Sequence, residues 1–153
     1  MLCQLDAAEL AQYVPALVAK LEDSDEHVRN ATVEVLGKLK AAVLAPYAPA
    51  LVAKLEHSGF FVRQAAVHVL GLLEASVLAQ NAPAIVAKLE HSDYGVRKVA
   101  LQALGLLEAA ELAPHAPAIV AKLEDSDAVV RQAALGALGK LAAILRRLDD
   151  LSH

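Results

Sequence analysis

The chain repeats one 34-residue pattern four times, and this repetition constrains its fold more than any other feature. The prolines that mark the period are Pro15, Pro49, Pro83 and Pro117. Each opens a Pro-Ala-(Leu/Ile)-Val-Ala-Lys-Leu-Glu segment, followed by a polar break, by Val-Arg and by a second apolar segment ending in Leu-Gly-x-Leu. A fixed period of this length is typical of solenoids, in which copies of one supersecondary unit stack on each other. We therefore expect function to reside on a surface rather than in a catalytic cluster.

The spacing divides a single domain, 1–153, into four units at 5–38, 39–72, 73–106 and 107–140. The third and fourth units agree at about two-thirds of their positions. Such agreement fits either a recent duplication or a deliberate consensus design. The sequence leaves both origins open, and it also leaves open whether the chain is part of a longer solenoid.

The repeat pattern ends after Leu141, and residues 141–152 predict an amphipathic C-terminal helix. Arginine and aspartate pairs separate its apolar residues, which are Leu141, Ile144, Leu145, Leu148 and Leu151. Solenoids need end units with a polar outer face, so this helix either caps the last unit or pairs with a second copy. We expect a homo-oligomer formed through the ends of the solenoid and this helix.

The first helix of each unit contains prolines, and their positions limit how that helix can form. In the second unit we predict a helix from about Ala45 to Glu56, which contains Pro46 and Pro49. A proline in a helix interior costs ~3 kcal/mol, whereas the first four N–H groups of a helix have no intrahelical partner. We therefore place the repeated proline in the first turn. The preceding segment, KAAVL or EAAEL, is then a separate short helix or a sharp bend.

The second helix of each unit follows the polar break, and in the first unit we predict it over Glu26–Leu39. The break supplies residues that favour helix N-caps: Ser24, Ser58, Ser92 and Ser126, with Asp25, Asp93 and Asp127. The 3.6-residue period predicts a buried stripe formed by Val28, Thr32, Val35 and Leu39, flanked by Ala31 and Leu36.

Composition and charge exclude several classes of partner. The chain is 57% hydrophobic, but no uncharged run approaches the ~20 residues that span a bilayer, so no membrane association is expected. A net charge of −4 disfavours nucleic acid. The single cysteine, Cys3, excludes an internal disulfide. The N-terminus has no basic region and carries Asp6 and Glu9, so no secretory signal is predicted and a cytoplasmic protein is expected.

The copies differ most at second-helix positions opposite the predicted stripe. Since solenoids present extended concave binding surfaces, we predict that these positions form a partner-binding groove for a protein or peptide. The predicted site residues are Asn30, Glu34, Phe60, Phe61, Gln64, His68, Tyr94, Lys98, Gln102 and Gln132, bordered by Val33, Val67, Leu101 and Leu135. Two adjacent phenylalanines near a helix start cannot both face the core, so at least one of Phe60 and Phe61 is expected to be exposed. Polar positions such as Asn30 and Gln132 also fit simple drift of exposed residues.

The motif of a proline-led helix followed by (D/H)-S-D-x-x-V-R and A-L-G-x-L resembles HEAT repeats, including the short units of bilin-lyase-type proteins. The residues that carry the resemblance are Asp25, Val28, Arg29, Leu36 and Gly37; Val62, Arg63, Leu70 and Gly71; Asp93, Val96, Arg97, Leu104 and Gly105; and Asp127, Val130, Arg131, Leu138 and Gly139. The resemblance implies an Asp–Arg ladder between adjacent units, which would involve Asp25, Asp93 and Asp127, with Gly59 interrupting it.

Histidine is the residue that most directly tests for catalytic chemistry. His57 and His91 each follow a glutamate, and stacking would place these pairs side by side as a metal site. The simpler interpretation is that histidine replaces the aspartate found at Asp23 and Asp125. HEAT-like deoxyhypusine hydroxylases bind iron through His-Glu dipeptides, and this sequence has Glu-His but no His-Glu. We therefore predict no metal, no cofactor and no enzymatic activity.

These observations predict an all-α protein: a right-handed α-solenoid of about four HEAT-like helix pairs that acts as a protein-interaction scaffold. One alternative is a fragment of a HEAT-like enzyme of the bilin-lyase or metal-hydroxylase type. Another is an engineered or excised repeat module without a native ligand. The sequence does not identify the partner.

Overall fold

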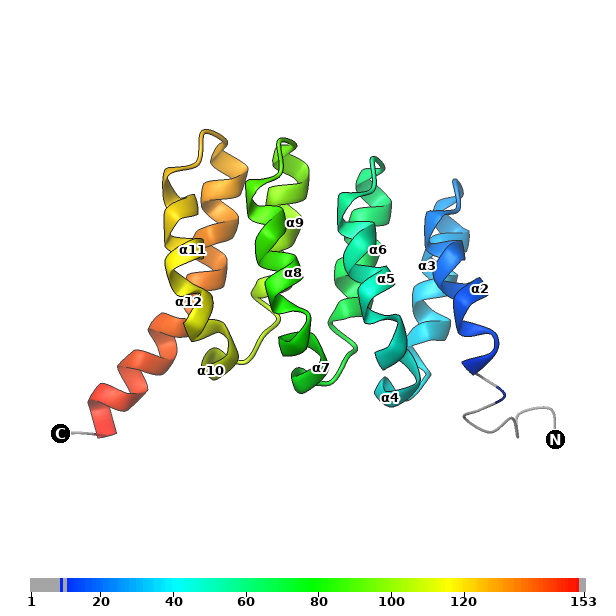
Figure 1. Ribbon diagram of the computed structural model, residues 1–153, viewed down its shortest axis with the longest axis horizontal. Coiled ribbons are helices and arrows are strands. Elements are labelled where there is room, and N and C mark those ends of the chain that lie inside the picture. The colour runs from blue at the N-terminus through cyan, green and yellow to red at the C-terminus, as the bar shows by residue number, and fades with distance from the viewer. Residues whose placement is uncertain (1–8, 10, 152–153) are drawn as a thin grey trace. The chain divides into compact units, whose positions relative to one another are not determined.

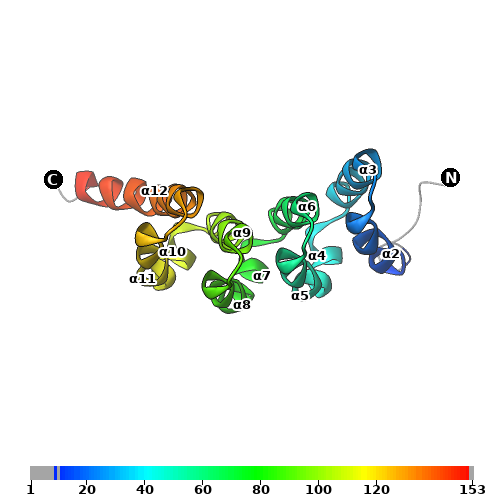
Figure 2. The same ribbon diagram turned by 90° about the horizontal axis from the view of Figure 1, so that it is seen from above.

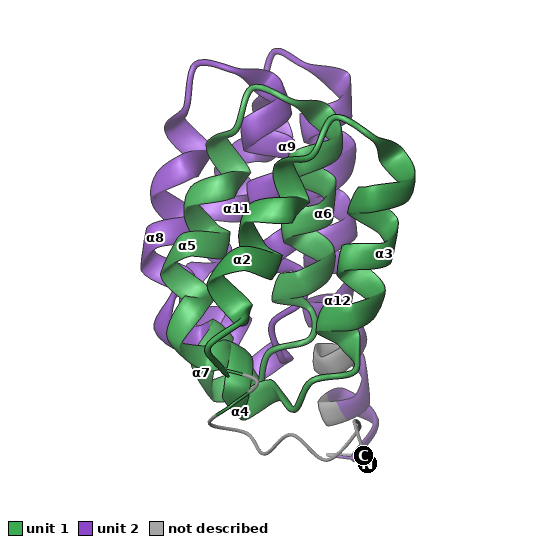
Figure 3. Cartoon of the chain, turned by 90° about the vertical axis from the view of Figure 1, so that its right-hand side faces the viewer, with its two compact units in different colours: residues 1–78 green, residues 79–153 purple. Residues whose placement is uncertain are grey.

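The computed structural model describes residue 9 and residues 11–151, and every regular element in this part of the chain is a helix (Figure 1). The chain forms two compact units, Met1–Leu78 and Ala79–His153 (Figure 3). The boundary falls inside α7 (Ala75–Gln80). The all-α prediction is therefore confirmed for the described residues.

Unit 1 contains two helix pairs. Its elements are α2 (Val14–Ala19), η1 (Lys20–Glu22), α3 (Glu26–Gly37), α4 (Ala41–Leu44), η2 (Ala45–Tyr47), α5 (Ala48–Ala53), η3 (Lys54–Glu56) and α6 (Phe60–Leu70), where η denotes a 3-10 helix. The second helices of the two pairs, α3 and α6, pack side by side in one layer, and α2 and α5 lie in the other (Figure 2).

Unit 2 has the same organisation. Its elements are α8 (Ala82–Ala87), η4 (Lys88–Glu90), α9 (Tyr94–Leu104), α10 (Ala109–Leu112), η5 (Ala113–His115), α11 (Ala116–Ala121), η6 (Lys122–Glu124) and α12 (Ala128–Leu151). Helix α12 packs along α9 and continues without a break into the segment predicted as a separate C-terminal helix. The side chains of Ile144, Leu145 and Leu148 lie outside the described residues, and Leu151 is 82% exposed.

The prolines occupy helix starts, as predicted. Pro15, Pro49, Pro83 and Pro117 lie at the first or second position of α2, α5, α8 and α11. Their missing N–H groups are ones that a helix start leaves without an intrahelical partner. The short helices predicted from KAAVL and EAAEL are α4 and α10.

The predicted helix over Ala45–Glu56 is helical throughout, but only its middle part, α5, is an α-helix, with the 3-10 helices η2 and η3 on either side. Pro46 and Pro114 open the 3-10 helices η2 and η5, which follow the four-residue helices α4 and α10. The third repeat has Gln80 at the corresponding position, and its α7 runs for six residues. The second proline of a repeat therefore accompanies an early end of the short helix, since proline cannot donate the hydrogen bond that would extend it.

The predicted stripe of α3 is only partly correct. Thr32 and Leu36 are buried, but Val28 is 37% exposed and Val35 is 42% exposed. Arg29, which the pattern did not include, is buried. Helix α3 contacts α2, η1 and α6, and Val28 and Val35 lie with Leu17 of α2 at a shallow hollow on the surface.

Among the described residues, no single helix is long and apolar enough to cross a membrane. The pair Glu26–Gly37 and Ala41–Glu56, bent by 119°, meets the criterion by length and composition only.

Candidate functional site

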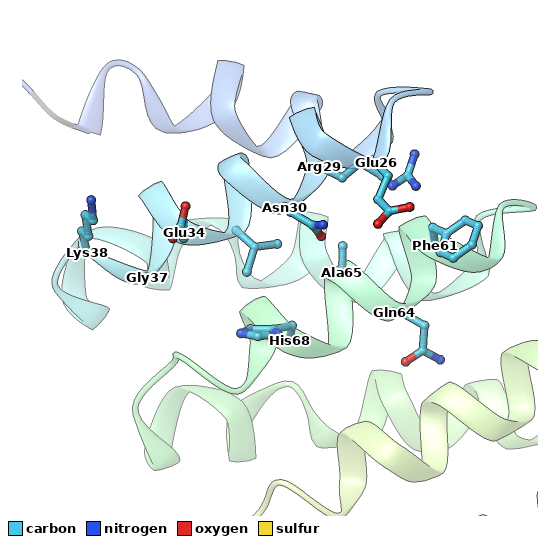
Figure 4. Close-up of a pocket in the computed structure, with 11 residues that line it drawn as sticks. Glu26, Arg29, Asn30, Glu34, Gly37, Lys38, Phe61, Gln64, Ala65 and His68 are labelled. Atoms are coloured by element: carbon cyan, nitrogen blue, oxygen red, sulfur yellow. The ribbon is translucent and has the colours of Figure 1, made fainter.

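A groove with a volume of about 650 Å³ runs between α3 and α6 in unit 1 (Figure 4). The residues that line it are Glu26, Arg29, Asn30, Val33, Glu34, Gly37, Lys38, Phe61, Gln64, Ala65 and His68. Both walls are second helices of adjacent repeats, as the sequence predicted. The groove is therefore a consequence of repeat stacking, and its chemistry depends on positions that differ between repeats.

Five of the predicted site residues meet in this groove. Asn30 and Glu34 project from α3, and Phe61, Gln64 and His68 project from α6 (Figure 4). Whether a partner binds there stays a prediction, but the predicted juxtaposition of these five side chains is present.

Phe60 and Phe61 are both exposed, by 48% and 59%, which confirms the expectation that at least one would be. Their rings meet edge to face, with centroids 5.3 Å apart and an interplanar angle of 79°. Only Phe61 lines the groove. The adjacent Phe60 is therefore a natural comparison for the contribution of Phe61.

The orientation of Phe61 follows from its contact with Arg29. The Arg29 guanidinium carbon lies 4.9 Å from the centre of the Phe61 ring, a cation–π geometry. Arg29 is only 8% exposed, and its Nη1 donates a hydrogen bond of 2.7 Å to the carbonyl oxygen of Asp23. One side of the ring thus rests on a fixed cation while more than half of Phe61 stays open to solvent.

The charges in the groove are mixed. Glu26 lies near Phe61 at one end, Lys38 lies at the other end, and Glu34 lies between them on α3 (Figure 4). Asn30 and Gln64 place a side-chain amide on each wall, and Val33 and Ala65 add apolar surface. Because an amide both donates and accepts hydrogen bonds, these walls can bind a polypeptide backbone beside an aromatic anchor.

The other predicted site residues lie in unit 2. Tyr94 is 54% exposed at the start of α9, Lys98 and Gln102 are half-buried on the same helix, and Gln132 is exposed on α12. Leu101, predicted to border a groove, is fully buried, so that prediction was wrong. Leu101 lies on α9, against which α12 packs, and this contact accounts for its burial.

Five residues line the groove but were absent from the predicted site: Glu26, Arg29, Gly37, Lys38 and Ala65. Arg29 belongs to the Val-Arg motif that occurs in all four repeats, and the resemblance to HEAT repeats implied a ladder role for that arginine. In the groove, Arg29 contacts the ring of Phe61, which follows it by 32 residues. The residues 32 positions after Arg63 and Arg97 are Gly95 and Val129, so neither of these arginines has an aromatic residue there. An arginine found in every repeat, combined with an aromatic residue found in only one, was the sequence signal that could have placed Arg29 in the groove.

The predicted Asp–Arg ladder uses a different aspartate. In unit 2, Arg97 donates from Nε to Asp125 Oδ2 at 3.0 Å and from Nη2 to Asp125 Oδ1 at 3.2 Å. The carboxylates of Asp25, Asp93 and Asp127 instead accept backbone N–H groups at the starts of α3, α9 and α12. The ladder assignment to these three residues was wrong, because their carboxylates cap helices. The serine N-caps were also wrong for three helices: the N-cap residues of α3, α6 and α9 are Asp25, Gly59 and Asp93.

Asp125 belongs to a position with one structural role in all four repeats. Its Oδ1 accepts the N–H of Asp127 at 2.9 Å, and Asp23 Oδ1 accepts the N–H of Asp25 at 2.8 Å. In the other repeats, Nδ1 of His57 and of His91 accepts the equivalent N–H at 2.9 and 3.0 Å. Histidine therefore replaces aspartate as a hydrogen-bond acceptor in this turn, which supports the simpler interpretation over a metal site.

Ion pairs join adjacent repeats within each unit. Glu22 accepts a hydrogen bond from Lys54 Nζ and lies 3.0 Å from His57 Nε2, and Lys122 lies 3.3 Å from Glu90.

The Lys54 hydrogen bond, opposed in part by desolvation, lowers the pKa of Glu22. Burial alone would raise the pKa of Asp125, but the hydrogen bonds from Arg97 and the Asp127 N–H, with the positive charge of Arg97, hold it below its usual value. Over the described residues, no group of three or more His, Cys, Asp or Glu side chains is arranged to hold a metal ion.

Comparison with known proteins agrees with this architecture. A sequence profile of HEAT repeats matches residues 1–71 and 82–152. Curated protein sequences gave no match. Among solved structures, the chain is similar to an engineered protein, with 20% identity and a TM-score of 0.53 over 84% of this chain and 62% of that chain. The protein thus spans less than two thirds of that structure.

Two further structures are similar at low identity. The complex of CpcE and CpcF of phycocyanin lyase from Nostoc sp. PCC7120 has 15% identity and a TM-score of 0.65, with 87% of this chain and 80% of that chain covered. A designed armadillo repeat protein in complex with peptide (KR)4 has 18% identity and a TM-score of 0.49, with 89% and 69% covered. Identities this low show the fold alone, whereas the sequence profile covers most of the chain. The protein has the α-solenoid fold and belongs to the HEAT-repeat family.

Proposed function

We propose that this protein is an interaction scaffold whose unit 1 groove binds an extended peptide or a protein segment. The observation that carries the proposal is Phe61, which is 59% exposed over a groove and held on its other side by buried Arg29. An exposed aromatic on a rigid support loses little conformational entropy when a partner covers it. Aromatic residues of this kind dominate the energetics of protein interfaces.

The apolar contribution of the groove has an estimable size. Full burial of a phenylalanine side chain stabilises by about 1.5–3 kcal/mol, and Phe61 still has more than half of its surface to bury. Val33 and Ala65 extend the apolar surface along the groove. A partner with an apolar side chain at this place therefore gains about 1–2 kcal/mol from Phe61 alone.

The polar walls favour a polypeptide over a purely apolar ligand. Asn30 on α3 and Gln64 on α6 carry amides that match the donors and acceptors of an extended backbone. Glu34 and Lys38 carry opposite charges along the α3 wall and can select for the partner's charge order. On unit 2, Tyr94, Lys98, Gln102 and Gln132 stay predicted partner-binding residues in their own right.

HEAT repeats typically mediate protein interactions, and the similar CpcE and CpcF structure is a complex of two proteins. We propose binding rather than catalysis for this chain, because the groove holds an aromatic anchor and neutral amides. The alternative of a HEAT-like enzyme would require a bound metal or a tetrapyrrole. Elemental analysis of the purified protein and its visible absorption spectrum distinguish the two: a stoichiometric metal or a visible band would contradict our proposal.

The direct test of the proposal is to locate the binding surface. Peptides selected from a displayed library against the full chain would be titrated into isotopically labelled protein and followed by NMR. We expect the largest amide shifts in α3 and α6, centred on Asn30, Phe61 and Gln64. Selected peptides that shift only residues outside these two helices would refute the groove as the site.

A further inference from the structure

Each repeat has two packing faces, and unit 1 exposes one of them. In the second repeat, Leu51, Val62 and Val69 are buried, with exposed fractions of 0%, 5% and 0%. Their counterparts in the first repeat are Leu17, which is half-buried, and Val28 and Val35, which are 37% and 42% exposed. These counterparts form part of a shallow hollow of about 340 Å³, which we name the leading face; it is lined by Leu17, His27, Val28, Ala31, Thr32 and Val35.

In unit 2, the corresponding face of the fourth repeat is covered by the repeat before it. Ala137, the counterpart of Val35 in the fourth repeat, is only 4% exposed. It lies against the end of α9, where a methyl group added to Gly105 would come within 3.8 Å of the Ala137 Cα. The leading face of the fourth repeat is therefore covered by the third repeat. The leading face of the first repeat carries Val35 where the fourth repeat has Ala137, and Val35 is exposed.

The opposite face is exposed at the other end of the chain. In the third repeat, Leu101 and Leu104 are fully buried beside α12. Leu135, the counterpart of Leu101 in the fourth repeat, is 62% exposed, and Val120 on α11 is 48% exposed. We name this surface the trailing face; it comprises Val120, Leu123, Leu135 and Leu138. None of its residues, and none of the leading-face residues, lines the groove.

The charged residues around the two faces occupy the repeat positions that form ion pairs between adjacent repeats. Within the units, a lysine of one repeat pairs with a glutamate of the preceding repeat, as in Lys54–Glu22 and Lys122–Glu90. An arginine pairs with an aspartate of the following repeat, as in Arg97–Asp125. The same positions at the chain's two ends are Lys20 and Asp23 on the first repeat and Glu124 and Arg131 on the fourth.

Three of these four end residues are exposed, and the side chain of the fourth, Asp23, is 24% exposed. Glu124 and Arg131 are exposed, and the side chain of Lys20 is 64% exposed. Lys20 lies 3.8 Å from Asp23 in its own repeat, a weak surface ion pair that rearrangement would replace at little cost. Arg97 donates from Nη1 to the His91 carbonyl and from Nε and Nη2 to the Asp125 carboxylate. Arg131 makes the equivalent Nη1 bond, to the Asp125 carbonyl, so its Nε and Nη2 correspond to the Arg97 atoms that bind an aspartate of the following repeat.

We propose that the protein self-associates head to tail, with the leading face of one copy packed on the trailing face of a second copy. Lys20 would pair with Glu124 of the second copy, and Asp23 with its Arg131. The contact repeats the junction between adjacent repeats and uses a different surface from the groove. Because the two surfaces differ, the association is heterologous and continues beyond a dimer.

Sedimentation equilibrium of the full chain tests the association itself. Over about a hundredfold range of concentration, the weight-average mass should rise past that of a dimer, because each added copy offers a new open face. A mass that stays at the 16.1 kDa of one chain across the range would overturn the proposal. A mass that stops at a dimer would also overturn it, because that outcome indicates a symmetric contact.

A pair of blocked variants tests the head-to-tail arrangement. Val35→Asp blocks the leading face and Leu135→Asp blocks the trailing face, so each variant alone should be a monomer. An equimolar mixture should form a heterodimer that grows no further, since one intact face of each kind remains. Ala84→Asp, at an exposed residue of α8 outside both faces, is the matched control and should associate like the wild type.

Folding and charge controls complete the design. Helical circular dichroism should be unchanged in these variants because the substituted side chains are exposed. Glu124→Lys should weaken association about two- to fivefold, and Glu124→Lys combined with Lys20→Glu should recover it, because the pair is restored with reversed charges. Association that survives both Val35→Asp and Leu135→Asp would refute the two faces and indicate pairing through the end of α12.

Discussion

The guanidinium of Arg29 lies 4.9 Å from the centre of the Phe61 ring, so a buried cation supports the most exposed aromatic of the groove. Arg29 also donates to the Asp23 carbonyl at 2.7 Å, which fixes the turn before α3. The two residues belong to adjacent repeats, 32 positions apart. The contact therefore links the stability of unit 1 to the geometry of its groove.

Replacement of Arg29 should destabilise the protein more than replacement of the same position in the last repeat. Arg29→Gln loses a charge-assisted hydrogen bond and the contact with Phe61, and we expect a loss of about 2–3 kcal/mol in the free energy of unfolding. Arg131→Gln is the matched control, because Arg131 makes the same carbonyl bond, to Asp125 at 2.7 Å, but is exposed. Urea unfolding measures both, and equal losses would contradict a stabilising role for the ring contact.

The Arg97–Asp125 pair predicts a specific dependence of stability on pH. The pKa of Asp125 is lower in the folded protein than the ordinary aspartate value of 3.8. A carboxylate with a lowered folded pKa contributes stability above its unfolded pKa and loses it as pH falls toward the folded value. Asp125→Asn should therefore lower the unfolding temperature at neutral pH, and the difference from wild type should shrink below about pH 4. Unfolding temperatures that differ equally at pH 7 and pH 3 would refute this linkage.

The turn at His57 depends on a hydrogen-bond acceptor, so the size of the substituted side chain matters less than its chemistry. His57→Ala removes the acceptor for the Gly59 N–H and should cost about 1–2 kcal/mol. His57→Asn retains an acceptor and should recover at least half of that loss, since asparagine forms the same type of turn. Chemical unfolding compares the two variants. An equal loss in both would show that the Glu22 contact of His57, at 3.0 Å, carries its contribution instead.

The sequence was sufficient to predict the repeat, the helix pairs and the proline positions because these depend on local rules. Pro49 can lie only where a missing N–H is tolerated, and the period placed it at a helix start in every repeat. Five groove residues, among them Phe61 and Gln64, were predicted because the positions that differ between repeats lie on the helix side opposite the positions that pack in the core.

The errors arose where a position depends on its neighbours in space. Val28 and Val62 occupy the same repeat position, yet Val28 is 37% exposed and Val62 is 5% exposed, because only Val62 has a preceding repeat packed on it within unit 1. Leu101 was placed at the groove but is buried beside α12. The ladder implied by the resemblance named Asp127, whereas Arg97 binds Asp125, two residues earlier, because the Asp127 carboxylate caps α12.

The central claim is that Phe61 anchors a bound polypeptide, and calorimetric titration of a selected peptide tests it most directly. Phe61→Ala should weaken binding about tenfold or more, which corresponds to a hot-spot loss, while the circular dichroism spectrum stays that of the wild type and the unfolding temperature falls only by the few degrees expected from the lost Arg29 contact. Phe60→Ala, which removes an adjacent ring that is 48% exposed but outside the groove lining, should weaken binding by less than about threefold. Equal affinities of the wild type and Phe61→Ala for a peptide that binds unit 1 would contradict the account.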